Sequence, residues 1–189
     1  MIKPTYLTIF ALIVMSCSSE VSREKRPLVD AVDNKVRDID ANHRVSIRED
    51  DFHQGDSIYK IRGYFMDETL LKLVGVLHTS HIDRDDYFYF DEHVPIFSGH
   101  VVVSKDDNIA SEYKYYYGAD GFVDEALYWE DHYTPGKRFP VEHFNEFEPD
   151  RDSLRQAEEE RLLFFLTKLE MEGFEIRHLN ENLDANVKR

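Results

Sequence analysis

Residues 57–65 read Ser-Ile-Tyr-Lys-Ile-Arg-Gly-Tyr-Phe, and their alternation is the pattern that decides the fold. The odd-numbered positions from Tyr59 to Phe65 are apolar or small, whereas Lys60 and Arg62 stand between them. Successive side chains of a β-strand point to opposite faces, so one face of this stretch would be buried and the other would be wet. The stretch therefore predicts a strand of a half-buried antiparallel sheet.

Five more short runs follow along the chain, each rich in tyrosine, phenylalanine, valine and leucine and each bounded by turn-forming residues. Such runs are typical of β-strands. They cover residues 70–77, 86–90, 96–104, 111–117 and 122–129, and residues 45–48 are a candidate seventh strand. Their succession predicts an antiparallel meander of six or seven strands.

An aromatic run before an acidic turn, followed by an aliphatic strand, occurs three times in this region. The acidic turns stand at Asp67, at Asp91 and at Asp120-Gly121. Because the spacing between them grows from 24 to 29 residues, each copy is interpreted as one hairpin of a meander. The pattern resembles the repeated hairpins of uncharacterised bacterial envelope proteins and of MORN-like repeat proteins, which implies the same hairpin architecture here.

Two segments outside the strands follow the helical period. A helix that begins at Pro27 carries its apolar residues on one stripe, at Leu28, Val32, Val36 and Ile39. We expect the stripe to pack on the protein's own domain, and a partner-binding face is the alternative.

A second, longer helix is expected from about Asp150 to Gly173, with Ser153 and Gln156 as its capping box. Its middle, residues 162–166, is Leu-Leu-Phe-Phe-Leu, and five consecutive apolar residues surround a helix completely. We therefore expect burial on more than one side, either between the sheet and the first helix or partly against another protein. The proline-containing segment before this helix, residues 130–150, is expected to cross over the sheet.

These elements predict one α+β domain over residues 27–189, an antiparallel meander flanked by an N-terminal helix and a longer C-terminal helix. If both helices packed on one face, the other face would be left open. The consecutive aromatic residues at 87–90 and 113–117 would then supply a platform of tyrosines for a protein or glycan partner.

The chain carries 38 acidic and 23 basic side chains in 189 residues, a formal net charge of −15. Binding to nucleic acid requires clustered cations against the phosphates, and no basic stripe occurs in the sequence. Nucleic acid is therefore not an expected partner. The sequence also lacks glycine-rich phosphate-binding motifs, and no cofactor is predicted.

The amino terminus has the features of a secretory signal. Lys3 precedes an uncharged run over residues 6–15, which is shorter than the ~20 residues that a membrane-spanning helix needs. Val14-Met15-Ser16-Cys17 resembles the lipobox of bacterial lipoproteins, although Met15 replaces the usual small residue. An ordinary signal peptide with a coincidental cysteine is the alternative interpretation.

The resemblance implies that residues 1–16 are a signal peptide that is removed and that Cys17, the only cysteine, carries acyl chains. Residues 17–26 would then be a lipidated tether, because they are polar and lack apolar periodicity. The acyl chains on Cys17 would hold the protein at a membrane of the bacterial cell envelope, either in the periplasm or exposed at the surface.

Side chains that could bind a metal ion or take part in catalysis are most frequent around His78, His81 and Asp83, between two predicted strands. Imidazole and carboxylate groups can bind zinc, but this spacing equally fits a solvated loop, and no metal site is assigned. With Cys17 acylated and no Gly-x-Ser-x-Gly motif present, no catalytic residue is assigned either.

The sequence predicts a lipid-anchored cell-envelope protein that acts as a non-enzymatic binding or interaction module through its β-sheet. An envelope protein or a glycan is the expected partner. One alternative is a small-molecule or lipid carrier with an apolar cavity under the C-terminal helix. The other is a metal-dependent or carboxylate hydrolase.

Overall fold

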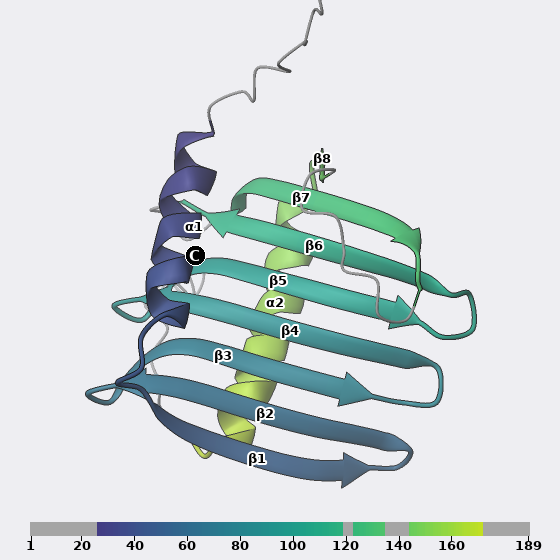
Figure 1. The fold of residues 1–189 in the computed structure, drawn as a ribbon, viewed down its shortest axis with the longest axis horizontal. Coiled ribbons are helices and arrows are strands. Elements are labelled where there is room, and N and C mark those ends of the chain that lie inside the picture. Colours follow the sequence, from purple (N-terminus) through teal and green to yellow (C-terminus); the bar gives the residue numbers. More distant parts are fainter. Residues whose placement is uncertain (1–25, 119–122, 135–143, 172–189) are drawn as a thin grey trace, which may run out of the picture.

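The computed structural model describes residues 26–118, 123–134 and 144–171, which form one antiparallel sheet and two helices (Figure 1). The predicted α+β class is therefore confirmed. The strands are β1 (Ser46–Gln54), β2 (Ser57–Met66), β3 (Thr69–His78), β4 (Ile82–Asp91), β5 (Val94–Ser104), β6 (Ile109–Tyr117), β7 (Val123–His132) and β8 (Asn145–Glu146). They lie in chain order across the sheet, so the predicted meander is also confirmed.

The expected six or seven strands were too few, because the sheet has eight. The additional strand, β8, is only two residues long and pairs with Leu127 and Tyr128 of β7. The first strand also extends further than the predicted residues 45–48. β1 continues through polar and largely exposed residues because it is an edge strand, and its pairing with β2 holds it in place.

The first two acidic turns close hairpins, as predicted. Asp67 with Glu68, and Glu92 with His93 after Asp91, have positive φ at both central positions, as the twist of a two-residue hairpin turn requires. The third turn, Asp120-Gly121, lies outside the described residues.

All three predicted repeat units share a second feature, a shift of register next to the turn. In each unit the strand after the turn holds one extra residue, and these are Leu71, Ile96 and Asp124. Such bulges increase the local twist of a sheet. The weak sequence repeat therefore corresponds to a repeated backbone geometry.

The two helices, α1 (Pro27–Asp40) and α2 (Arg151–Lys168), lie on opposite faces of the sheet, called here the α1 face and the α2 face (Figure 1). The expectation that both would pack on one face is wrong. The chain changes face around the β7–β8 edge. Phe144 packs with Trp129 on the α1 face, and three residues later Phe147 packs against Tyr113 and Tyr115 on the α2 face.

On the α1 face, the apolar stripe of α1 packs inside the domain, as expected. Val32 is buried against Phe97, and the hydroxyls of Tyr89 and Tyr116 donate hydrogen bonds to Asp40 and Asp33 of the helix. These two tyrosines are almost fully buried. The open tyrosine platform predicted from the sequence is therefore absent from these positions.

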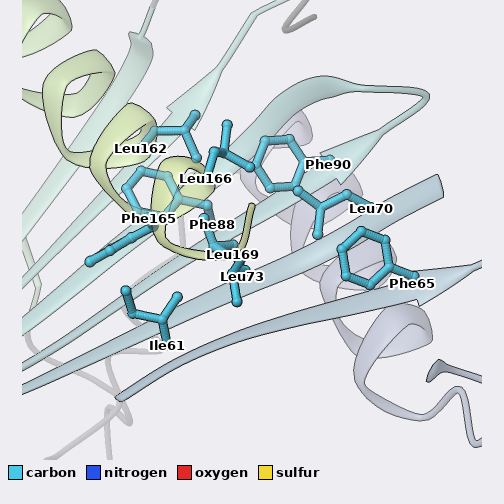
Figure 2. Packing of buried hydrophobic residues seen from close by; sticks show 10 residues of the cluster. All are labelled: Ile61, Phe65, Leu70, Leu73, Phe88, Phe90, Leu162, Phe165, Leu166 and Leu169. Carbon is cyan, nitrogen blue, oxygen red and sulfur yellow. The ribbon is translucent and has the colours of Figure 1, made fainter. Parts of the chain in front are cut away.

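The main core lies between α2 and strands β2 to β4 (Figure 2). One stripe of the helix meets one face of the sheet there, and its ten buried residues are Ile61, Phe65, Leu70, Leu73, Phe88, Phe90, Leu162, Phe165, Leu166 and Leu169. α1 lies on the opposite face of the sheet, so the expectation that residues 162–166 are buried between the sheet and the first helix is wrong. Leu163 is 52 % exposed, and among the described residues the cover of α2 comes from its sheet side. A contact of this helix with another protein stays a prediction.

The cap of α2 also differs from the prediction. Asp150 is the N-cap, and its side chain accepts hydrogen bonds from the backbone N–H groups of Asp152 and Ser153. The predicted capping box is wrong because Ser153 Oγ donates to Asp150 and Gln156 instead contacts Glu160. Gly173, the predicted end of the helix, lies outside the described residues, as do the lipobox and Cys17.

Gly75 on β3 allows α2 to approach the sheet, and this contact can be tested. A methyl group at position 75 would lie 2.2 Å from Phe165 Cζ, so Gly75→Ala forces the ring away from the sheet. We expect a loss of about 1–3 kcal/mol in the free energy of unfolding, measured with urea. In a Phe165→Leu background the same substitution should cost much less. Equal costs in the two backgrounds would contradict this contact.

Candidate functional site

A buried histidine lies between two carboxylates on the α2 face. His100 of β5 is 3 % exposed and stands directly opposite Asp86 of β4 in the strand register. Its Nδ1 lies 2.6 Å from Asp86 Oδ1, and its Nε2 lies 2.8 Å from Glu158 Oε2 on α2. Since carboxylates only accept, both ring nitrogens donate, and the imidazole is positively charged.

A second layer of hydrogen bonds fixes the two carboxylates. Ser98 Oγ donates to Glu158 over 2.8 Å, so the Tyr117 hydroxyl, 2.9 Å from the same oxygen, must donate to Ser98. Arg161 donates to Glu158 over 2.7 Å, and Arg84 Nε donates to Asp86 over 2.7 Å. The bonds between these side chains and the two carboxylates therefore run toward the carboxylate oxygens. Arg161 Nη1 also lies 3.3 Å from both ring nitrogens of His100.

The electrostatics of the cluster favour the charged form of each group. Burial lowers the pKa of His100, but the nearby Glu158 and Asp86 outweigh burial and raise it overall. Burial likewise raises the pKa of both carboxyl groups, but their contacts with His100 and with the arginines hold them below the ordinary range. The result is a buried cluster of three cations and two anions that joins β4, β5 and α2.

A groove of about 410 Å³ lies beside this cluster, between α2 and the strands β2 to β4. Its size is that of a site for a small molecule. Aromatic and aliphatic side chains line one part of it and charged groups the other, and the main ones are Tyr59, Leu77, Phe164, Arg84, Asp86 and Arg161.

The aromatic wall of the groove is built by stacking. Tyr59 and Phe164 meet edge to face with their ring centroids 5.6 Å apart. Phe52 of β1 stacks on Tyr59 at 4.8 Å with nearly parallel rings and meets Phe164 edge to face at 6.1 Å. Lys168 lies over the Phe52 ring at 4.5 Å. The wall is therefore held by three rings from two strands and the helix.

The loop around His78 and His81, to which the sequence assigned no metal site, forms separate surface pairs in the structure. His78 Nδ1 lies 2.9 Å from Asp83 Oδ1 across the β3–β4 pair, whereas His81 Nδ1 contacts Asp106 at 2.8 Å. Asp83 is also paired with Lys105 at 2.6 Å. The three side chains thus form separate surface pairs, and no group of three histidine, cysteine or acidic side chains within the described residues is placed to hold a metal ion.

The sequence reasoning missed His100, Asp86 and Glu158, although a signal was present. Within their strands, Asp86 shares a face with the buried Phe88, and His100 shares one with the buried Ser98. Polar residues at the buried positions of neighbouring strands need partners. This pattern could have pointed to the cluster.

No protein-family model, curated protein or solved structure matches this chain. Neither α1 nor α2, the two helices that the structure describes, is long and apolar enough to cross a bilayer. The function is therefore argued from the groove and from the amino-terminal sequence.

The cluster predicts how stability depends on pH. The raised pKa of His100 stabilises the folded state. This contribution is complete below the pKa of the unfolded chain, about 6.5, and is lost as the pH rises through the pKa of the folded chain. The lowered pKa values of Asp86 and Glu158 contribute stability above about pH 4.5, which is lost on acidification. Unfolding in urea should therefore show maximal stability between about pH 5 and 6 and a decline above neutral pH.

A direct readout of the same prediction is the NMR signal of the His100 ring, with an unstructured histidine-containing peptide as the reference. The ring of His100 should remain doubly protonated above the ordinary histidine pKa of about 6.5. His100→Gln should be destabilised by about 3–5 kcal/mol and should lose most of the alkaline decline. Deprotonation of His100 at or below the midpoint of the reference peptide would contradict the cluster as described.

Proposed function

We propose that this chain is a lipid-anchored protein of the bacterial cell envelope that works as a non-enzymatic binding module through its β-sheet. The anchor rests on the likeness of Val14-Met15-Ser16-Cys17 to a lipobox. The binding role rests on one observation, the groove on the α2 face that combines an aromatic wall with two arginines. An envelope protein or glycan bound by the sheet would place one of its chemical groups in this groove.

The chemistry of the groove supports binding rather than catalysis. A general base needs a nitrogen or oxygen free to take a proton, and both ring nitrogens of His100 are engaged with carboxylates. Asp86 reaches the groove, but its Oδ1 accepts from both His100 and Arg84. Glu160 also borders the groove, where its Oε1 accepts from Gln156, and the other lining groups are rings, aliphatic side chains and guanidinium nitrogens, which hold a ligand without reacting with it.

A carrier of small molecules is the second candidate, because the groove runs beside the C-terminal helix α2. A carrier would release its ligand to another protein, whereas a binding module would keep a partner at the envelope. The third candidate is a metal-dependent or carboxylate hydrolase. The separate pairing of His78 and His81 gives its metal-dependent form no support.

The lipid anchor can be tested in cells. We expect the chain to incorporate radiolabelled palmitate and to enter the detergent phase on phase separation, because acyl chains on Cys17 would hold it in the membrane. Cys17→Ala should abolish both, whereas the neighbouring Ser19→Ala should not. An inhibitor of the lipoprotein signal peptidase should leave the precursor uncleaved. Normal processing under the inhibitor would sink this part of the proposal.

A further inference from the structure

We infer that the groove on the α2 face binds a small organic anion, a ligand that joins a carboxylate or phosphate group to a flat apolar part. The inference rests on the proposed binding role of this face and names the chemistry of its ligand. It is argued from the unused hydrogen-bond donors of two arginines, from the aromatic wall and from the charge of the cluster below them.

The arginines supply the anion end. Arg84 donates to Asp86 through Nε alone, which leaves its terminal nitrogens without a hydrogen bond to any described residue. Arg161 uses Nη1 toward Glu158, so that Nη2 remains. A guanidinium presents paired N–H groups in a fixed fork that matches the oxygens of a carboxylate or phosphate. Two such forks border the same groove.

The buried cluster makes these arginines suitable for an anion. Asp86 and Glu158 are 4 % and 6 % exposed, and they hold Arg84 and Arg161 in place. With the cation of His100 included, the cluster has one more positive than negative charge, although the whole chain carries −15. The guanidinium groups are thus positioned before the ligand arrives, which lowers the entropic cost of binding.

A second acidic side chain borders the groove besides Asp86. Glu160 also borders the groove, but it is exposed, and its Oε1 accepts a hydrogen bond from Gln156 one turn earlier on α2. Its charge is therefore screened by solvent.

The aromatic wall supplies the apolar end. Tyr59 and Phe164 present ring surfaces in the same groove as the arginines, at a separation that edge-to-face pairs prefer. A flat apolar group can pack against these rings while its anionic group reaches the guanidinium forks. An inorganic anion would use only one part of the site, and a neutral aromatic compound only the other.

Calorimetry on the full chain in phosphatidylcholine nanodiscs tests the inference with four probes. Phenyl phosphate and benzoate should bind with dissociation constants of ~0.1–1 mM, as expected for ligands of their size. Inorganic phosphate and phenol should each bind at least about tenfold more weakly, since each lacks one of the two parts. Absence of binding by both phenyl phosphate and benzoate to the folded chain overturns the inference.

Variants then assign the site. Arg84→Gln should weaken phenyl phosphate about tenfold or more and leave phenol unchanged, whereas Phe164→Leu should weaken both. Arg84→Lys keeps the charge beside Asp86, and with it the fold, but should still weaken phenyl phosphate because the fork is lost. The matched control is Arg62→Gln, on the α1 face of β2 and paired with Glu49, which should change nothing. Equal effects of Arg62→Gln and Arg84→Gln would overturn the assignment.

Two further experiments distinguish a failure of this inference from a failure of the proposed function. Short-chain phosphatidylglycerol should not displace phenyl phosphate, and displacement would identify a lipid headgroup as the ligand instead. A photoreactive residue at Tyr59 tests the wider role in cells. A specific crosslink to one envelope component, together with failure of all anionic probes, would leave the binding module standing and reject the organic anion.

Discussion

Two carboxylates, Asp86 on β4 and Glu158 on α2, share one buried imidazole between them. Removing such charges from water costs several kcal/mol per ion, and the cost is offset only while every partner keeps its geometry. The apolar contacts of α2 are not directional in this way. We infer that the ion cluster fixes the rotation and position of the helix on the sheet. Because Arg161 and Phe164 follow Glu158 on the same helix, the cluster also sets both walls of the groove.

The repeated hairpins explain how an ionic cluster came to lie beside an apolar core. Three cross-strand pairs occupy the same place relative to the bulge of each unit, and they are Ile61 with Gly75, Asp86 with His100 and Tyr113 with Tyr128. The backbone position is the same, but the chemistry differs. The first pair leaves room for Phe165, the second holds Glu158, and the third places two tilted rings 4.8 Å apart against Phe147. The repeated geometry thus gives α2 two different contacts, one apolar and one ionic.

Local patterns in the sequence were enough to predict strands β2 to β7, part of β1, the first two hairpins and both helices, because periodicity and turn residues act over a few positions. The placement of α2 could not be predicted in this way, since it depends on how the chain passes around the β7–β8 edge. The ion cluster around His100 could not be predicted for the same reason. His100 meets a partner 14 residues away and another 58 residues away, and only the pairing of β4 with β5 and the packing of α2 bring them together. The residues around His78 carried no site assignment, and in the structure His78 and His81 pair with different acidic side chains.

The acidity of the chain limits how an anion can reach the groove. A formal charge of −15 repels anions at distances within the Debye length of about 8 Å at physiological salt, so long-range attraction does not bring the ligand in. Specificity must instead come from direct contacts with Arg84 and Arg161. The same acidity disfavours adsorption to anionic lipid headgroups, which leaves the acyl chains proposed for Cys17 as the membrane contact. The proposed anchor at Cys17 and the groove beside α2 would therefore have separate roles, and the charge of the chain would keep those roles apart.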